Sequence, residues 1–289
     1  MGILRSYVHV LARQQATHPV NGSVLTLGQQ AMYVDLRTVG RILMDEHCPM
    51  TDLPGDFDTR SKFNDTNTNA RALFTALGAK TVQALDVSGY EDADIISDFG
   101  APINEDLHEK FDFIFDAGTL EHIFNLPIAL SNICRMLTVG GHIALFNPCS
   151  NAIDHGFYSI SPTLYYDFFG ANGFSKFSCY LIEGSNVRYG APCKVYSCSP
   201  EVLEYPFSSR HNVVVAFFAT KESDVFPTSE PFQSLFSGIW TPRAVSAQKR
   251  GAVRKLASFV LRHCPALIER TVHEERRRGR KGIRHLGTW

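Results

Sequence analysis

Acidic residues directly after two candidate strands are the first feature of this sequence that could do chemistry. Asp86 follows the apolar run 81–85, and Asp98 follows the run 93–97. The carboxyl ends of parallel strands share one edge of a sheet, where ligands bind. There, one carboxylate can accept hydrogen bonds from both hydroxyls of a ribose, and another from an adenine amino group. A lone Asp is more often a helix cap or a turn residue, but two at successive strand ends favour a nucleoside site.

Gly28 marks a third strand end, because it follows the run 23–27 and precedes Gln29. A glycine here lets the backbone approach a ligand closely. Three candidate strands therefore end in a glycine or an acid at the edge where open α/β sheets bind ligands.

Two histidines, His122 and His155, are candidate general bases. His122 follows a fourth apolar run, and His155 lies in the segment 151–156, just after a fifth. Neutral imidazole is available near neutral pH, and group transfer to oxygen or nitrogen needs an aligned nucleophile and often a base. His122 could equally pin a strand-to-helix loop, and His155 could be a surface turn residue.

Residues 111–148 contain the clearest structural unit. The run 111–115 is almost wholly apolar, which suits a strand buried on both faces. A helical spacing of apolar residues follows, at Leu126, Leu130, Ile133, Cys134 and Leu137. The run 142–146 then predicts a second strand after two glycines. The three elements form a βαβ unit, whose crossover is almost always right-handed.

The remaining elements extend this unit to an α/β fold. Strands are predicted at 23–27, 81–85, 93–97, 177–182 and 212–220, and helices at 1–20, 32–43, 69–77 and 162–171. The segment 48–68 is rich in Pro, Gly, Asp, Asn and Thr and predicts a loop or lid.

The order of these motifs resembles that of class I S-adenosylmethionine-dependent methyltransferases, especially the small-molecule-type branch with an LEH segment after the fourth strand. The resemblance covers residues 22–221 and rests on VLTLG, ALD, ISD, FDFIFDAGTLEHI, LTVGGHIALFNP and SPTLYYDFFGANGF. It implies a Rossmann-like α/β sandwich with a mostly parallel seven-stranded sheet and helices on both faces. It also implies S-adenosyl-L-methionine as the cofactor.

The same resemblance implies roles for individual residues at the strand ends. Glu121 and His122 would lie at the mouth of the site. The cofactor would be held by Gly28 and Gln29 beside its methionine part, Asp86 on the ribose, Asp98 near the adenine, and Ala117 and Gly118 beneath the sulfonium.

The chain departs from the family pattern in two places. The family usually has a GxGxG turn after the first strand, whereas here Gly28 is followed by Gln29 and Gln30. The segment 87–97 is too short for the usual helix, and residues 89–92 predict only a turn. These departures predict a cofactor pocket in a modified form.

A divalent metal is an alternative ligand for Glu121, His122 and His155. This trio resembles part of the metal-binding pattern of metal-assisted RNA 2′-O-methyltransferases. That pattern also has an acid three residues before the glutamate, where this chain has Gly118. Because one ligand is missing, the sequence prediction is that no metal binds.

Charge and composition divide the chain into a body and a tail. Residues 243–289 hold 13 Lys or Arg against 3 Asp or Glu, although the whole chain has a net charge of −1. The predicted domains are a methyltransferase-like body at 1–221, a linker at 222–242 and a basic helical extension at 243–289. The tail could bind nucleic acid, but a solvated helix is favoured because aromatic residues are not interleaved.

Cysteine usage and apolar run length indicate a cytoplasmic protein. The seven cysteines form no CxxC pair, which argues against a disulfide framework or a zinc knuckle. No apolar run approaches the ~20 residues of a membrane-spanning helix, and the N-terminus is predicted to be an ordinary helix.

The sequence prediction is thus a methyltransferase acting on an O or N atom of a small molecule or sugar. His122 and His155 are its candidate catalytic residues, and a homodimer stays open. The alternatives are a methyltransferase-fold protein that has lost its activity, supported by the single-glycine turn, and an RNA methyltransferase that uses the tail. The acceptor itself cannot be named, because loops and insertions build acceptor pockets in such folds.

Overall fold

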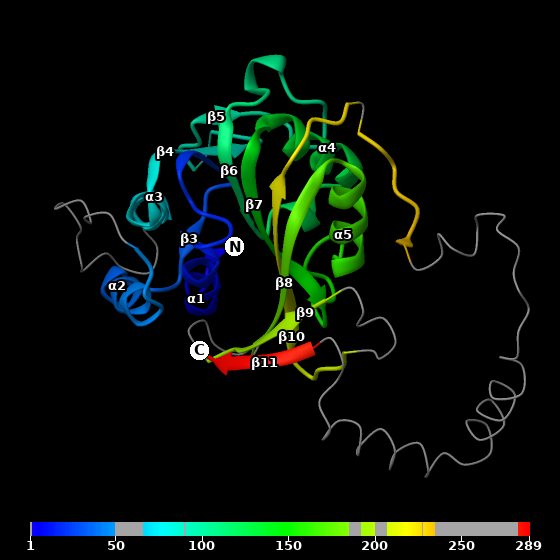
Figure 1. Cartoon of the computed structure of the whole chain (residues 1–289). Coiled ribbons are helices and arrows are strands. Elements are labelled where there is room, and N and C mark those ends of the chain that lie inside the picture. Colours follow the sequence, from blue (N-terminus) through cyan, green and yellow to red (C-terminus); the bar gives the residue numbers. More distant parts are fainter. Residues whose placement is uncertain are drawn as a thin grey trace, which may run out of the picture.

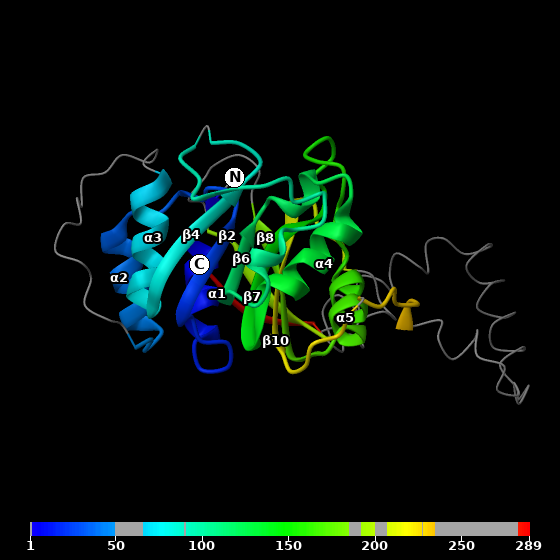
Figure 2. The same cartoon turned by 90° about the horizontal axis from the view of Figure 1, so that it is seen from above.

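The computed structural model describes residues 2–49, 66–89, 91–184, 192–199, 207–226, 228–234 and 283–289. The described residues form one large sheet with helices on both faces (Figures 1 and 2). A second, two-stranded sheet pairs β1 (Gly2–Ile3) with β3 (Ala31–Met32) in parallel.

Within the described part of the chain, the large sheet has nine strands in the order β11-β9-β8-β10-β7-β6-β2-β4-β5. Their bounds are β2 Gly22–Leu27, β4 Ala79–Asp86, β5 Ile95–Ile96, β6 Phe111–Ala117, β7 Leu137–Ser150, β8 Phe174–Gly184, β9 Lys194–Cys198, β10 Asn212–Lys221 and β11 Ile283–Thr288. The strands from β5 to β7 are mutually parallel, whereas each neighbouring pair from β7 to β11 is antiparallel.

The strand order reverses between β2 and β6. From β2 the chain proceeds outward to β4 and β5, then crosses to the other side of β2 to form β6 and β7. In open α/β sheets this reversal creates a crevice at the carboxyl ends of the strands, where ligands bind. The predicted site residues at the ends of β2, β4 and β6 therefore belong to the switch point of the sheet.

The prediction of a mostly parallel, seven-stranded sheet is wrong, since the sheet is mixed and has nine strands. Two strands account for the difference. No strand is predicted between 182 and 212, yet β9 lies there and pairs with β8. Residues 283–288 were predicted to be helical but form β11, because the exposed edge of β9 offers them backbone partners.

Among the described residues, five α-helices cover the sheet: α1 Arg5–Gln14, α2 Leu36–Asp45, α3 Thr66–Leu77, α4 Leu126–Met136 and α5 Pro162–Ala171. The predicted start of α5 is confirmed, because the Ser161 hydroxyl accepts a hydrogen bond from the Thr163 N–H, with Pro162 in the first turn. The helix predicted at 32–43 begins only at Leu36, where the Asp35 side chain caps it. Most of the predicted loop or lid at 48–68 lies outside the described residues.

Successive side chains along the strands point to opposite faces of the sheet and so divide the core into two layers. Phe113, Phe115 and Phe146 pack with α1, α2 and α3 on one face. Ile114, Ile143 and Leu145 pack with α4 and α5 on the other face. The view from above shows α2 and α3 on one side of the sheet and α4 and α5 on the other (Figure 2). The strands are apolar on both faces because both are covered, as expected for the parallel part of a sheet.

The described part of the segment predicted as a linker packs against α5. The Asn172 side chain accepts a hydrogen bond from the Ser229 N–H at 2.6 Å, and Asp167 accepts one from the Ser234 N–H at 2.9 Å. Figure 1 shows this segment running past α4 and α5. Most of the predicted basic extension lies outside the described residues, so its binding to nucleic acid stays a prediction. None of the described helices is long and apolar enough to cross a membrane.

We predict that the fold loses stability in mild acid through His142. Burial, with His18 beside it, lowers the pKa of His142 to about 4. The unfolded chain takes up a proton below about pH 6.5, so the free energy of unfolding should fall as pH drops from about 6.5 toward 4. The free energy of unfolding can be measured by urea denaturation at several pH values in this range. Its fall with pH should be smaller in His142→Gln than in the wild type by up to about 3 kcal/mol.

The matched control is His211→Gln, which alters an exposed histidine. This variant should keep the wild-type pH dependence. If His142→Gln and the wild type lose stability in parallel, the decrease has another origin.

Candidate active site

Gly28 brings the ends of three strands together. It follows β2 with φ of +70°, and its N–H donates to the Leu85 carbonyl of β4 at 2.7 Å. A Cβ at this position would lie 2.9 Å from Thr119 Oγ1 and 3.7 Å from Asp86 Oδ2. Only glycine adopts this backbone conformation without strain, and only glycine leaves the space beside Asp86 and Thr119 open.

Asp86 lies half-buried at the end of β4, beside Gly28. Its Oδ1 accepts a hydrogen bond from the Ser88 N–H at 3.2 Å. A carboxylate has about four lone-pair sites, so this one turn contact leaves it capacity to accept from a ligand hydroxyl. The structure therefore places two predicted site residues, Gly28 and Asp86, next to each other.

Asp98 is exposed and lies two residues beyond β5. Its Oδ1 accepts from the Gly100 N–H at 2.8 Å. A Cβ on Gly100 would lie 3.2 Å from this oxygen and 3.3 Å from Ile123. Asp98 thus sits beside the chain that follows β6, whereas Asp86 sits beside the end of β2. Both occupy the carboxyl edge, but each belongs to a different turn.

Gln29 and Gln30 stand where the family has further glycines. The Gln29 amide donates to the Asp92 carbonyl at 2.9 Å and ties this turn to the loop after β4. Gln30 is buried, and its Nε2 donates to the Leu27 carbonyl at 2.6 Å. Its Oε1 is buried without a hydrogen-bond partner. The side chain of Gln30 therefore fills space inside the turn.

Ala117 and Gly118 end β6 beside a buried acid, Asp116. Ala117 is buried, and Gly118 has φ of +99°. Asp116 Oδ1 accepts from the Thr119 N–H at 2.9 Å and so holds the turn into η2 (Leu120–His122). Burial and the charge of Glu121 raise the pKa of Asp116 to about 7.

A buried amide joins two acids beneath this turn. Asn147 Nδ2 donates to Asp116 Oδ2 at 2.5 Å and to Glu121 Oε2 at 3.0 Å, and the Tyr165 hydroxyl donates to Asn147 Oδ1 at 2.5 Å. All four side chains are fully buried. Sequence reasoning missed Asp116, Asn147 and Tyr165 as site residues. The available signal was a polar residue at the end of two otherwise apolar strands.

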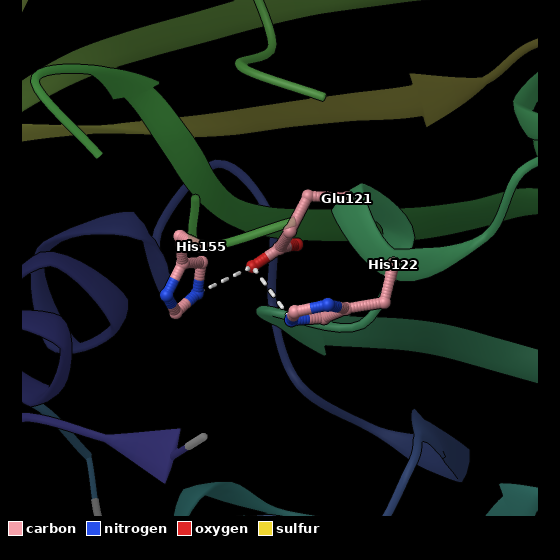
Figure 3. Close-up of side chains that lie close together, drawn as sticks. All are labelled: Glu121, His122 and His155. Carbon is pink, nitrogen blue, oxygen red and sulfur yellow. Dashed lines mark ion pairs between the residues drawn. The ribbon is translucent and has the colours of Figure 1, made fainter. Parts of the chain in front are cut away.

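Glu121 brings the two candidate catalytic histidines together (Figure 3). Its Oε1 lies 3.4 Å from His155 Nε2 and 3.9 Å from His122 Nε2. The Glu121 side chain is 0% exposed, whereas the His122 and His155 side chains are 42% and 43% exposed. Burial, followed by the neighbouring His155, lowers the pKa of His122, so its ring is neutral near neutral pH. Burial raises the pKa of Glu121.

The His155 loop is held against residues 121–124 by hydrogen bonds to two backbone carbonyls. The Tyr158 N–H donates to the Glu121 carbonyl at 3.2 Å, and the Tyr158 hydroxyl donates to the Phe124 carbonyl at 2.7 Å. A Cβ on Gly156 would lie 2.8 Å from that Glu121 carbonyl oxygen. Glycine at this position therefore permits the close approach that brings His155 to Glu121.

Comparisons with known proteins show similarity in fold only. No family model matches this chain, and no curated protein was found to match it. Among solved structures, the YcgJ protein from Bacillus subtilis is 8% identical with a TM-score of 0.39, covering 75% of this chain and 99% of that chain. A SAM-dependent methyltransferase from Archaeoglobus fulgidus is 12% identical with a TM-score of 0.39, and the match covers 75% of this chain and 94% of that chain.

A third structure is the N-methyltransferase NodS from Bradyrhizobium japonicum in complex with S-adenosyl-L-homocysteine. It is 14% identical with a TM-score of 0.36, covering 75% of this chain and 85% of that chain. The solved structures similar to this chain thus include S-adenosylmethionine-dependent methyltransferases. Identities and TM-scores this low show no family for this chain.

We predict that Asn147→Ala destabilises the protein by about 2–4 kcal/mol. The substitution removes the donor shared by two buried carboxylates, and a buried acceptor left without a donor costs about 1–3 kcal/mol, more when charged. Tyr165→Phe should cost about 1 kcal/mol, since it removes only the donor to Asn147. Denaturant unfolding measures both changes.

Asn125→Ala serves as the control, because Asn125 is exposed and makes no side-chain capping hydrogen bond. It should leave the free energy of unfolding within about 0.5 kcal/mol of wild type. An equally small effect of Asn147→Ala would contradict the view that this amide holds the two acids.

Proposed function

We propose that this protein transfers a methyl group from S-adenosyl-L-methionine to an O or N atom of a small molecule or sugar. The observation that carries the proposal is the grouping of Gly28, Asp86 and Thr119 at the switch point of the sheet. A glycine with positive φ beside an acid from the next strand suits a nucleoside that lies close to the backbone.

The turn after β2 favours this cofactor over a dinucleotide. A dinucleotide needs a glycine-rich turn that leads directly into a helix, whose N-terminus binds the pyrophosphate. Here the chain passes from Gly28 into β3, and α2 begins only at Leu36. The edge also carries the carboxylates of Asp86 and Asp98, which suit a sulfonium cation better than a diphosphate.

We assign the cofactor contacts from the family resemblance and the geometry together. Asp86 would accept hydrogen bonds from the ribose hydroxyls, with the backbone of Gly28 and Gln29 beside the methionine part. Asp98 would take the adenine amino group, and Ala117 with Gly118 would lie beneath the sulfonium. The bound cofactor supplies the methyl group that is transferred.

The acceptor would meet the chain at the two histidines. The rings of His122 and His155 would take a proton from an acceptor hydroxyl or amine, and Glu121, whose Oε1 lies 3.9 Å and 3.4 Å from their Nε2 atoms, would orient them. Phe124 and Phe157 are exposed beside this site and pack edge to face, with their ring centroids 5.5 Å apart. They would favour an acceptor with an apolar part.

A fold that no longer binds the cofactor is the second candidate. The buried side chain of Gln30 favours it, because that side chain occupies the turn where glycines usually leave room for the ligand. The RNA methyltransferase alternative depends on the tail, most of which lies outside the described residues.

Calorimetry with S-adenosyl-L-methionine and S-adenosyl-L-homocysteine separates the first two candidates. We predict binding to the wild type and at least about tenfold weaker binding to Asp86→Ala, since hydrogen bonds to a charged group contribute about 1.5–3 kcal/mol. Asp106→Ala is the control, because Asp106 is an exposed acid in the first turn of η1 (Glu105–Leu107). It should bind like the wild type.

No heat with either ligand, or equal binding by Asp86→Ala, would refute the cofactor site. The protein would then be a methyltransferase-like fold without the activity. Addition of Gln30→Gly to the same series tests the second candidate directly, because that variant should bind more tightly if the glutamine obstructs the site.

A further inference from the structure

We propose that Glu121, His122 and His155 bind one divalent transition-metal ion. The carboxylate Oε1 and the two imidazole nitrogens all lie within 4.8 Å of one another. Figure 3 shows a dashed line from this oxygen to a nitrogen of each ring. The three donors come from η2 and from the loop after β7, which the Gly156 contact holds together.

The buried oxygen of Glu121 is the independent sign of a missing ligand. Its partner oxygen Oε2 accepts from Asn147 at 3.0 Å, whereas Oε1 is buried without a hydrogen-bond partner. A buried carboxylate oxygen without a partner is costly, and the usual remedies are a donor or a cation. Oε1 faces two imidazole nitrogens, which are common metal ligands in proteins. A cation bound between the three atoms would give Oε1 the partner that it lacks.

The spacing fits first-row metals. Ligand atoms about 2.0–2.1 Å from a tetrahedral ion lie roughly 3.3–3.4 Å apart. The Glu121–His155 separation of 3.4 Å matches this value, and the Glu121–His122 separation of 3.9 Å needs a small ring movement. Both rings are partly exposed and can turn, whereas the carboxylate is fixed from below.

The donor set indicates which metals are suited. Two imidazoles and one carboxylate bind Mn²⁺, Fe²⁺, Co²⁺ or Zn²⁺, whereas Mg²⁺ and Ca²⁺ prefer oxygen ligands alone. Three protein ligands leave coordination positions open for water or an acceptor oxygen. Asn147 would orient the carboxylate from behind, as hydrogen-bond partners of metal ligands commonly do.

This inference goes beyond the proposed function and replaces one part of it. With a metal bound, the two imidazoles would be ligands and not free bases. The metal would lower the pKa of an acceptor hydroxyl that binds it, and the proton of that hydroxyl would pass to water. Metal binding itself does not require the cofactor, and the two sites can therefore be tested separately.

To test the site, the untagged protein is first stripped of metal with a chelator. It is then titrated in a calorimeter with Mn²⁺ alone and, separately, with Co²⁺ alone. Mn²⁺ is chosen because carboxylates and imidazoles suit it, whereas thiolates of the free cysteines prefer softer metals. We expect one equivalent of metal to bind. Glu121→Gln and His155→Ala should each weaken binding at least tenfold, and Asn147→Ala should weaken it less.

His211→Ala is the control, since this exposed histidine belongs to a different loop. It should bind metal like the wild type. Co²⁺ should also give visible absorption bands that Glu121→Gln removes, a readout that a change in stability alone would not produce.

Two results would overturn the metal site. One is the absence of binding to the wild type at millimolar metal. The other is binding that Glu121→Gln and His155→Ala leave unchanged, which would locate the metal elsewhere. If S-adenosyl-L-methionine still binds in either case, the proposed function survives, and the histidines return to the role of bases.

Discussion

The buried hydrogen bonds of Asn147 are the interaction on which the candidate site depends. One amide nitrogen is shared by the carboxylates of Asp116 and Glu121, which lie in a fully buried environment. Hydrogen bonds from this donor favour the ionised form of each acid and oppose the effect of burial, which raises the pKa of both. The amide fixes the turn at the end of β6 through one acid and positions the second beneath the histidines.

The same network explains why the site lies at this point of the fold. Asp116 ends β6 and Asn147 lies in the neighbouring β7, so the parallel pairing of these strands brings their polar ends together. Tyr165 reaches the amide from α5, which covers that face of the sheet. Three elements distant in the sequence thus converge under one short helix, η2, and both core layers hold them in register.

Much of this architecture could be predicted from local pattern, and the rest could not. Apolar runs located β2, β4 and β6, because strands covered on both faces leave a continuous apolar signal. The strand β9 was not predicted, because its residues are mixed in polarity and it depends on β8 and β11 for backbone partners. The positions of Gly28 and Asp86 were predictable from topology. The hydrogen bonds of Asn147 to two acids were not, because a polar residue in a strand sequence does not indicate which side chains it will contact.

Charge connects the two ligands that we propose. A sulfonium and a divalent metal are both cations, and two cations at one edge repel each other unless negative groups lie near them. Asp86 and Asp98 supply that charge at the ends of β4 and β5, and Asp116 and Glu121 supply it beneath η2. Burial and the charge of Glu121 raise the pKa of Asp116 to about 7, so its ionised form is costly. A bound cation near these acids would offset that cost, so occupancy of the edge and ionisation of its carboxylates favour each other.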